Sequence, residues 1–231
     1  KTHSYTYDLS GQLLTERDAN GGQWSFVYDQ DGRTTDVTDP MGGTAHYTYD
    51  SNGNVLSQTN PNGGVTSFVY DAISRMTQGT DPAGGVVKFT YDGVGNLLTK
   101  VDANDHVTAY AYNNSNDLIT ITDAAGSIRS FIYDLAGQLT SATGPLGDVT
   151  AYAYDLAGRL SRQTGPTGAV NAFTYDAMGN RLTETDPLGN TVSYTYDALN
   201  RVITVTDPLG NTTTNTYDNL GRVVSTTNAR S

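Results

Sequence analysis

The sequence contains no cysteine, and only three of its 231 residues are lysine. Without cysteine the chain can form neither a disulfide framework nor a thiolate metal site. The formal net charge is -11, and the chain lacks the clustered basic residues that nucleic-acid binding requires. No apolar run approaches the length of a membrane span. We therefore expect a protein that neither binds nucleic acid nor inserts into a membrane.

The aromatic residues, in contrast, follow a strict 21-residue period. All 16 Tyr and all 5 Phe fall on two positions of this period, which leaves Trp24 as the one aromatic outside it. The main series comprises Tyr7, Tyr28, Tyr49, Tyr70, Tyr91, Tyr112, Tyr133, Tyr154, Tyr175, Tyr196 and Tyr217. The second series lies two residues earlier and comprises Tyr5, Phe26, Tyr47, Phe68, Phe89, Tyr110, Phe131, Tyr152, Phe173 and Tyr194, with Asn215 in the last repeat. Such a period is typical of repeat proteins, in which each repeat packs on its neighbours.

Two turn signals punctuate each repeat. With the tyrosine of the main series as position 1, position 2 is Asp in ten repeats and Asn in one, and Gly predominates at position 5. A second signal spans positions 12 to 15, as in Asp186-Pro187-Leu188-Gly189. Proline suits the first corner of a turn and glycine supplies a left-handed residue, so both signals predict three-residue hairpin loops with a bulge. The glycine of one or other turn is replaced in four places, at Ser74, Asp105, Asn116 and Asn200.

The segments between the turns predict strands. Each is about seven residues long and rich in β-branched and aromatic residues, and no window has a helical period. We expect an all-β fold, a repetitive antiparallel β-hairpin meander that curls into a spiral shell or tube, because long sheets twist. The two aromatics of a repeat, two residues apart, share one face of the sheet. We expect rings such as Tyr91 and Tyr154 to be substantially buried, and each main-series hydroxyl to have a polar partner.

Residues 1–231 form a single array of eleven repeats in this interpretation. The sequence starts at position 16 of the repeat and ends at position 15, and no linker or change of composition interrupts it. We expect it to be a segment of a longer protein, whose further repeats are its nearest partners.

The sequence offers few candidate catalytic or metal-binding residues. The histidines His3, His46 and His106 occupy unrelated positions of the repeat, with no spacing typical of a triad or a zinc site. Of the 22 aspartates, 17 occupy positions 2 and 12, where capping of a turn is favoured over binding of Ca²⁺. Asn113 and Asn211 begin glycosylation acceptor patterns, which a Thr-rich chain also produces by chance. We therefore predict no enzyme, no catalytic, cofactor-binding or metal site residue, and no cofactor.

The repeats resemble those of the Rhs, or YD-repeat, family. The resemblance rests on runs such as Tyr154-Asp155-Leu156-Ala157-Gly158-Arg159-Leu160 and Thr185-Asp186-Pro187-Leu188-Gly189-Asn190. The family includes bacterial polymorphic toxins, shell components of insecticidal toxin complexes, and teneurins. The resemblance implies a hairpin sheet that spirals into a hollow shell, which encloses a C-terminal toxin in bacteria and serves as an adhesion scaffold in teneurins. The chain lacks a recognisable self-cleaving core segment and a toxin domain.

Three functions compete at this point. The first is a structural, non-catalytic wall of a secreted or cell-surface protein, which encloses a cavity that holds a toxin. The alternative is an extracellular fibre, tube or adhesion scaffold that assembles from the same repeats. A third is a binding module whose exposed aromatics hold a glycan. The strict repeat favours the first two, because it points to an extended assembled surface and not to one local site.

Overall fold

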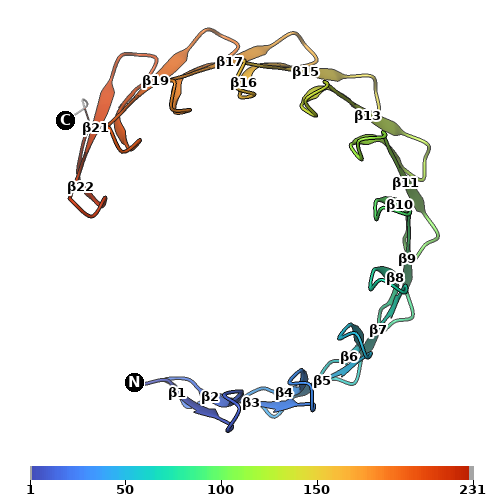
Figure 1. Ribbon diagram of the computed structural model, residues 1–231. Helices are drawn as coiled ribbons and strands as arrows, with labels where there is room; N and C mark the ends of the chain where they lie inside the picture. The colour runs from blue at the N-terminus through green and yellow to red at the C-terminus, as the bar shows by residue number, and fades with distance from the viewer. Residues whose placement is uncertain (1, 229–231) are drawn as a thin grey trace. The chain divides into compact units, whose positions relative to one another are not determined.

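A computed structural model describes residues 2–228 and contains only strands and turns in that range (Figure 1). The strands lie between the predicted turns, as the sequence indicated, and all but the first and the last occupy positions 7 to 11 or 17 to 1 of the repeat. They are β1 (Ser4–Tyr7), β2 (Leu13–Arg17), β3 (Gln23–Tyr28), β4 (Thr34–Thr38), β5 (Thr44–Tyr49), β6 (Val55–Thr59), β7 (Val65–Tyr70), β8 (Met76–Thr80), β9 (Val86–Tyr91), β10 (Leu97–Val101), β11 (Val107–Tyr112), β12 (Leu118–Thr122), β13 (Ile128–Tyr133), β14 (Leu139–Thr143), β15 (Val149–Tyr154), β16 (Leu160–Thr164), β17 (Val170–Tyr175), β18 (Arg181–Thr185), β19 (Thr191–Tyr196), β20 (Val202–Thr206), β21 (Thr212–Tyr217) and β22 (Val223–Asn228).

The chain divides into two compact bodies. The first runs to Tyr110 and also includes Asp123–Gly126, and the second comprises Ala111–Thr122 and the chain from Ser127 onward. In the first body, strands β1 to β10 and the first part of β11 pair antiparallel in sequence order, and in the second body β12 to β22 do the same. Each body taken by itself is a bent row of hairpins (Figure 1). The predicted all-β hairpin meander is therefore confirmed.

Both predicted turns have the same backbone geometry. In one, the N–H of Asp155 donates to the carbonyl of Arg159 at 2.9 Å, and the N–H of Gly158 donates back to the carbonyl of Asp155 at 2.9 Å. The Asp186 turn repeats this pattern, with Gly189 N–H donating to the Asp186 carbonyl at 3.0 Å. The glycine has a positive φ in both, 78° at Gly158 and 85° at Gly189. These are the three-residue loops with a left-handed last residue that the sequence predicted.

The glycine replacements adopt the same left-handed conformation. Ser74, Asp105, Asn116 and Asn200 have φ between 60° and 66°, and no other described non-glycine residue has a positive φ. Asn and Asp tolerate this region better than most residues do. At Ser74 the side-chain hydroxyl accepts a hydrogen bond from Asn54 Nδ2 at 2.9 Å, which ties this turn to the preceding repeat.

No side chain among residues 2–228 is fully buried. The main-series rings expected to be substantially buried, Tyr91 and Tyr154 among them, are partly exposed. The physical reason is that each body is a sheet one layer thick, so no second layer covers the aromatic face. Stability must therefore come from contacts between neighbouring strands and neighbouring repeats, as in other repeat architectures.

Candidate functional site

The tyrosine hydroxyls of the main series connect neighbouring repeats. Tyr175 Oη donates to the carbonyl of Leu160 at 2.9 Å, and Tyr154 Oη donates to the carbonyl of Leu139 at 2.9 Å. Each bond reaches back 15 residues, to position 7 of the preceding repeat. The same bond is made by Tyr28, Tyr49, Tyr91, Tyr133, Tyr196 and Tyr217. The predicted polar partner of these hydroxyls is thus a main-chain oxygen of the neighbouring repeat.

Arginine at position 6 makes a second connection between repeats. The guanidinium of Arg159 donates from Nε to Asp155 Oδ2 at 2.7 Å within its own turn. Its Nη1 donates to the carbonyl of Asp176 in the next repeat at 2.6 Å. Its central carbon lies 4.7 Å from the centre of the Tyr175 ring, a cation–π distance. Arg33, Arg75 and Arg201 repeat all three contacts.

The carboxylates of the turn aspartates accept hydrogen bonds from residues of their own turn. In the Asp155 turn, Oδ1 accepts the main-chain N–H groups of Ala157 and Arg159 at 2.9 and 3.0 Å. The side-chain hydrogen bond from Arg159, followed by the main-chain one, lowers the pKa of Asp155 below its ordinary value. Among residues 2–228, no group of three or more His, Cys, Asp or Glu side chains is placed to hold a metal ion. The turn-capping interpretation therefore accounts for these carboxylates.

The three histidines lie beside carboxylates that the sequence did not associate with them. His46 Nδ1 lies 2.8 Å from Asp36 Oδ1, and His106 Nδ1 lies 3.1 Å from Asp102 Oδ2. His3 lies 3.9 Å from Glu16. The hydroxyl near the first pair belongs to Thr35, and it donates to Asp36 and not to the imidazole. A nucleophile activated by histidine must contact the imidazole, so this pair lacks the geometry of a triad.

Hydroxyl pairs line the face opposite the aromatic rows, a feature that the sequence analysis did not identify. Thr90 Oγ1 and Thr99 Oγ1 lie 2.6 Å apart across β9 and β10. The same contact joins Thr6 to Thr15, Thr48 to Ser57, Thr174 to Thr183, Thr195 to Thr204, and Thr216 to Ser225. The signal in the sequence is the Thr or Ser at position 9, but recognising it requires the pairing register, which the bulge beside each tyrosine shifts.

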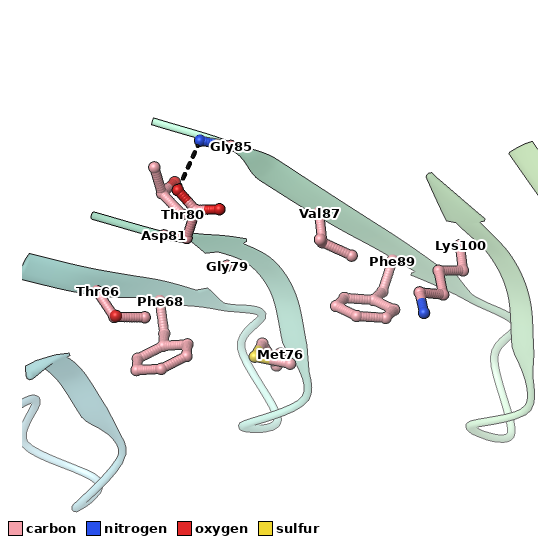
Figure 2. Close-up of a pocket in the computed structure, with 10 residues that line it drawn as sticks. All are labelled: Thr66, Phe68, Met76, Gly79, Thr80, Asp81, Gly85, Val87, Phe89 and Lys100. Atoms are coloured by element: carbon pink, nitrogen blue, oxygen red, sulfur yellow. Dashed lines mark hydrogen bonds between the residues drawn. The ribbon is translucent and has the colours of Figure 1, made fainter. Parts of the chain in front are cut away.

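One hollow on the aromatic face has an apolar lining. It lies over β7, β8 and β9 and measures about 350 Å³. Figure 2 shows Phe68, Met76, Val87 and Phe89 around it, with Asp81 and Lys100 at its margins. No residue of this hollow was predicted as a site residue, because position 10 of the repeat, where Gly79 stands, carries no constant chemistry. A hollow of this volume with a mainly apolar lining is suited to hold a small ligand.

Comparison with known proteins gives the family and the fold. A model of the Teneurin YD-shell matches residues 66–229, and a model of the RHS Repeat matches residues 7–44 and 28–64. The crystal structure of TcdB2-TccC3-Cdc42 is similar, with a TM-score of 0.72 and 18% identity over 97% of this chain. The crystal structure of TcdB2-TccC3 has a TM-score of 0.62 and 17% identity over 98% of this chain.

The chain spans a small part of those structures, 14% of the first and 16% of the second. At such identities the likeness is one of fold. No curated protein sequence matches the chain, and the described residues contain no helix able to cross a membrane. The Teneurin YD-shell match covers well over half of the residues and agrees with the tyrosine–aspartate turns described above. The chain therefore belongs to the teneurin YD-shell family.

Proposed function

We propose that this chain is a non-catalytic wall segment of a longer secreted or cell-surface Rhs-type protein. In this proposal residues 1–231 are one continuous array of repeats, which curls in the parent protein and encloses a cavity that holds a toxin. Its partners are further repeats of the same polypeptide and the enclosed domain. The family match and the likeness to toxin-complex structures support a shell role.

The observation that carries the proposal is the bond that recurs from main-series tyrosines to the preceding repeat, as from Tyr175 to Leu160 and from Tyr154 to Leu139. Together with the arginine contacts, this bond stiffens a sheet that has no fully buried side chain in its described part. A one-layer sheet held together between neighbouring repeats suits a wall, since it can extend and bend without a second layer. The twist of sheets supplies the curvature.

Electron microscopy of the parent protein tests this function. We expect hollow particles whose wall contains these repeats, and protection of the enclosed domain from added protease until the wall is unfolded. A solid two-layer sandwich without a lumen, or an enclosed domain that is digested as fast as a free one, would contradict the proposal.

The alternative is a fibre, tube or adhesion scaffold. It is favoured by the regular period, since eleven repeats follow one another without an insertion or deletion. Extended filaments in the same micrographs would establish this function in place of the first.

The absence of catalysis is part of the proposal. It is supported by the His46 imidazole, which contacts only the Asp36 carboxylate and no hydroxyl or thiol in the hydrogen bonds described. We expect no hydrolysis of ester, peptide or glycoside model substrates. Turnover that disappears in His46→Ala or His106→Ala would refute this expectation.

A further inference from the structure

Gly79 is the one glycine within the described strands, and the backbone does not require it. Unlike the glycines at positions 5 and 15 of the repeat, such as Gly158 and Gly189, it does not have a positive φ. A Cβ added there would meet only the Phe68 ring, whose nearest atom would lie 3.7 Å away, an ordinary contact. Glycine weakens a strand interior and often marks a place where another group approaches closely. Neither backbone conformation nor lack of space therefore explains this residue.

The missing side chain opens the hollow described above. In the pairing register, Gly79 stands opposite Phe68 on β7 and opposite Val87 on β9. The equivalent position on β4 is Val37, opposite Phe26 and Ala45, so a β-branched side chain is compatible with this place in the repeat. At Gly79 that volume is empty, and the walls are the apolar side chains shown in Figure 2.

The margin of the hollow carries a free positive charge. Lys100 stands opposite Phe89 in the register of β9 and β10, and its side chain lies on the same side of the sheet as that ring (Figure 2). It is exposed and forms no ion pair with a described carboxylate. Asp81, at the opposite margin, is occupied by its own turn, since its Oδ1 accepts the N–H groups of Ala83 and Gly85 at 2.8 and 2.9 Å.

We propose that this hollow binds a small aromatic anion, a ring that carries a carboxylate or sulfonate group. The ring lies between Phe68 and Phe89 in the space above Gly79, and the anionic group pairs with the Lys100 ammonium. The volume of about 350 Å³ falls within the range of small-molecule sites. Aromatic rings add favourable ring–ring contacts to the burial of apolar area. In a chain of net charge -11, an unpaired lysine beside an apolar hollow selects for such an anion.

The methionines provide a site-specific readout, because the chain has only three. Met76 lines the hollow, whereas Met41 and Met178 are 95% and 75% exposed and lie elsewhere. The protein, labelled with ¹³C in its methionine methyl groups, is titrated with 8-anilinonaphthalene-1-sulfonate and followed by NMR. We expect the Met76 signal to shift and saturate while the other two stay in place. Parallel shifts of all three signals, or no shift of Met76, would overturn the proposal.

Variants then test the two halves of the site. Gly79→Val fills the hollow with the side chain found at Val37 and should reduce affinity for the probe by at least about tenfold, with folding checked by circular dichroism. Lys100→Gln, which introduces the residue found at the equivalent position Gln58, should weaken binding severalfold and reduce its dependence on salt. The uncharged N-phenyl-1-naphthylamine should bind the native protein more weakly than the sulfonate does.

A relocated hollow serves as the matched control. The double variant Val37→Gly with Gly79→Val opens a gap at the equivalent position of another repeat, where Gln58 replaces Lys100 at the margin and Tyr47 and Ala45 replace Phe89 and Val87. Probe fluorescence should not recover in this variant. Recovery to the native level, or native affinity in Gly79→Val alone, would show that the glycine and the lysine do not form a site.

Discussion

Tyr175 donates its hydroxyl to the main-chain oxygen of Leu160 at 2.9 Å, across the boundary between two repeats. The acceptor is a main-chain atom, so the bond does not depend on which side chain occupies position 7. Phenylalanine would provide the ring but not the bond. This relationship gives a reason for tyrosine instead of phenylalanine at position 1, whereas position 20 carries Tyr in some repeats, Phe in others and Asn at Asn215.

We predict that Tyr175→Phe lowers the free energy of unfolding by about 1 kcal/mol, the usual value of one hydrogen bond in a protein. The matched control is Tyr152→Phe at position 20, where the hydroxyl has no hydrogen bond among those described and several repeats already carry Phe. That control should change stability by no more than a few tenths of a kcal/mol. Denaturant titration measures both, and equal losses would refute the role assigned to the hydroxyl.

Arg159→Lys should lower the unfolding temperature by a few degrees. Lysine keeps the charge but cannot reach Asp155, the Asp176 carbonyl and the Tyr175 ring with one planar group. Arg162→Lys serves as control, because Arg162 is exposed and has no described partner. Thermal unfolding followed by circular dichroism compares the two, and an equally small effect of both would contradict the proposed connection between repeats.

Asp105→Gly should raise the free energy of unfolding by about 0.5–1 kcal/mol. Asp105 has a φ of 60°, which strains a residue with a Cβ, and glycine relieves that strain. Asn104→Gly in the same turn, where φ is not positive, should instead destabilise, since glycine only adds freedom to the unfolded chain. Denaturant titration measures the change in the free energy of unfolding for both variants. A lower value for Asp105→Gly than for the native protein would contradict the strain argument.

Stability should fall in acid. Hydrogen bonds lower the pKa of Asp155 and Asp197 in the folded chain, chiefly from the side chains of Arg159 and Arg201, whereas the unfolded chain keeps the ordinary value of 3.8. Between the lowered and the ordinary pKa the unfolded chain binds more protons, so stability rises with pH there. The contribution is complete above about pH 5, where the unfolded carboxyls are also ionised, and is lost as pH falls through the ordinary pKa towards the lowered one. Denaturation midpoints from pH 7 to pH 2 measure the loss.

A second loss is expected in base. Burial raises the pKa of Tyr49, Tyr133 and Tyr196 above the ordinary 10.0. Above pH 10 the unfolded chain therefore loses these protons first, and stability falls as pH rises. Ionisation also removes the proton that each hydroxyl donates to the preceding repeat. Tyrosine absorbance recorded with the unfolding signal tests this, and a midpoint that stays constant to pH 11 would exclude it.

Local chemistry made the strands and turns predictable from the sequence. Asp155, Gly158 and Pro187 specify their turns through contacts within a few residues, and the alternation of the aromatic pair specifies one face. The sequence also predicted that each main-series tyrosine hydroxyl has a hydrogen-bond partner, because a buried phenol usually forms a hydrogen bond.

Only the tertiary structure showed which residues of other strands and repeats these side chains contact. The acceptor of Tyr175 is a carbonyl 15 residues away, the partner of His46 lies across a hairpin, and the apolar hollow exists because Gly79 falls opposite Phe68. These relationships depend on the register between strands, which the bulge beside each tyrosine shifts by one residue. The partial exposure of the aromatic rows likewise reflects the single layer of each body, because the periodicity of a sequence identifies the face of a sheet but not what covers it.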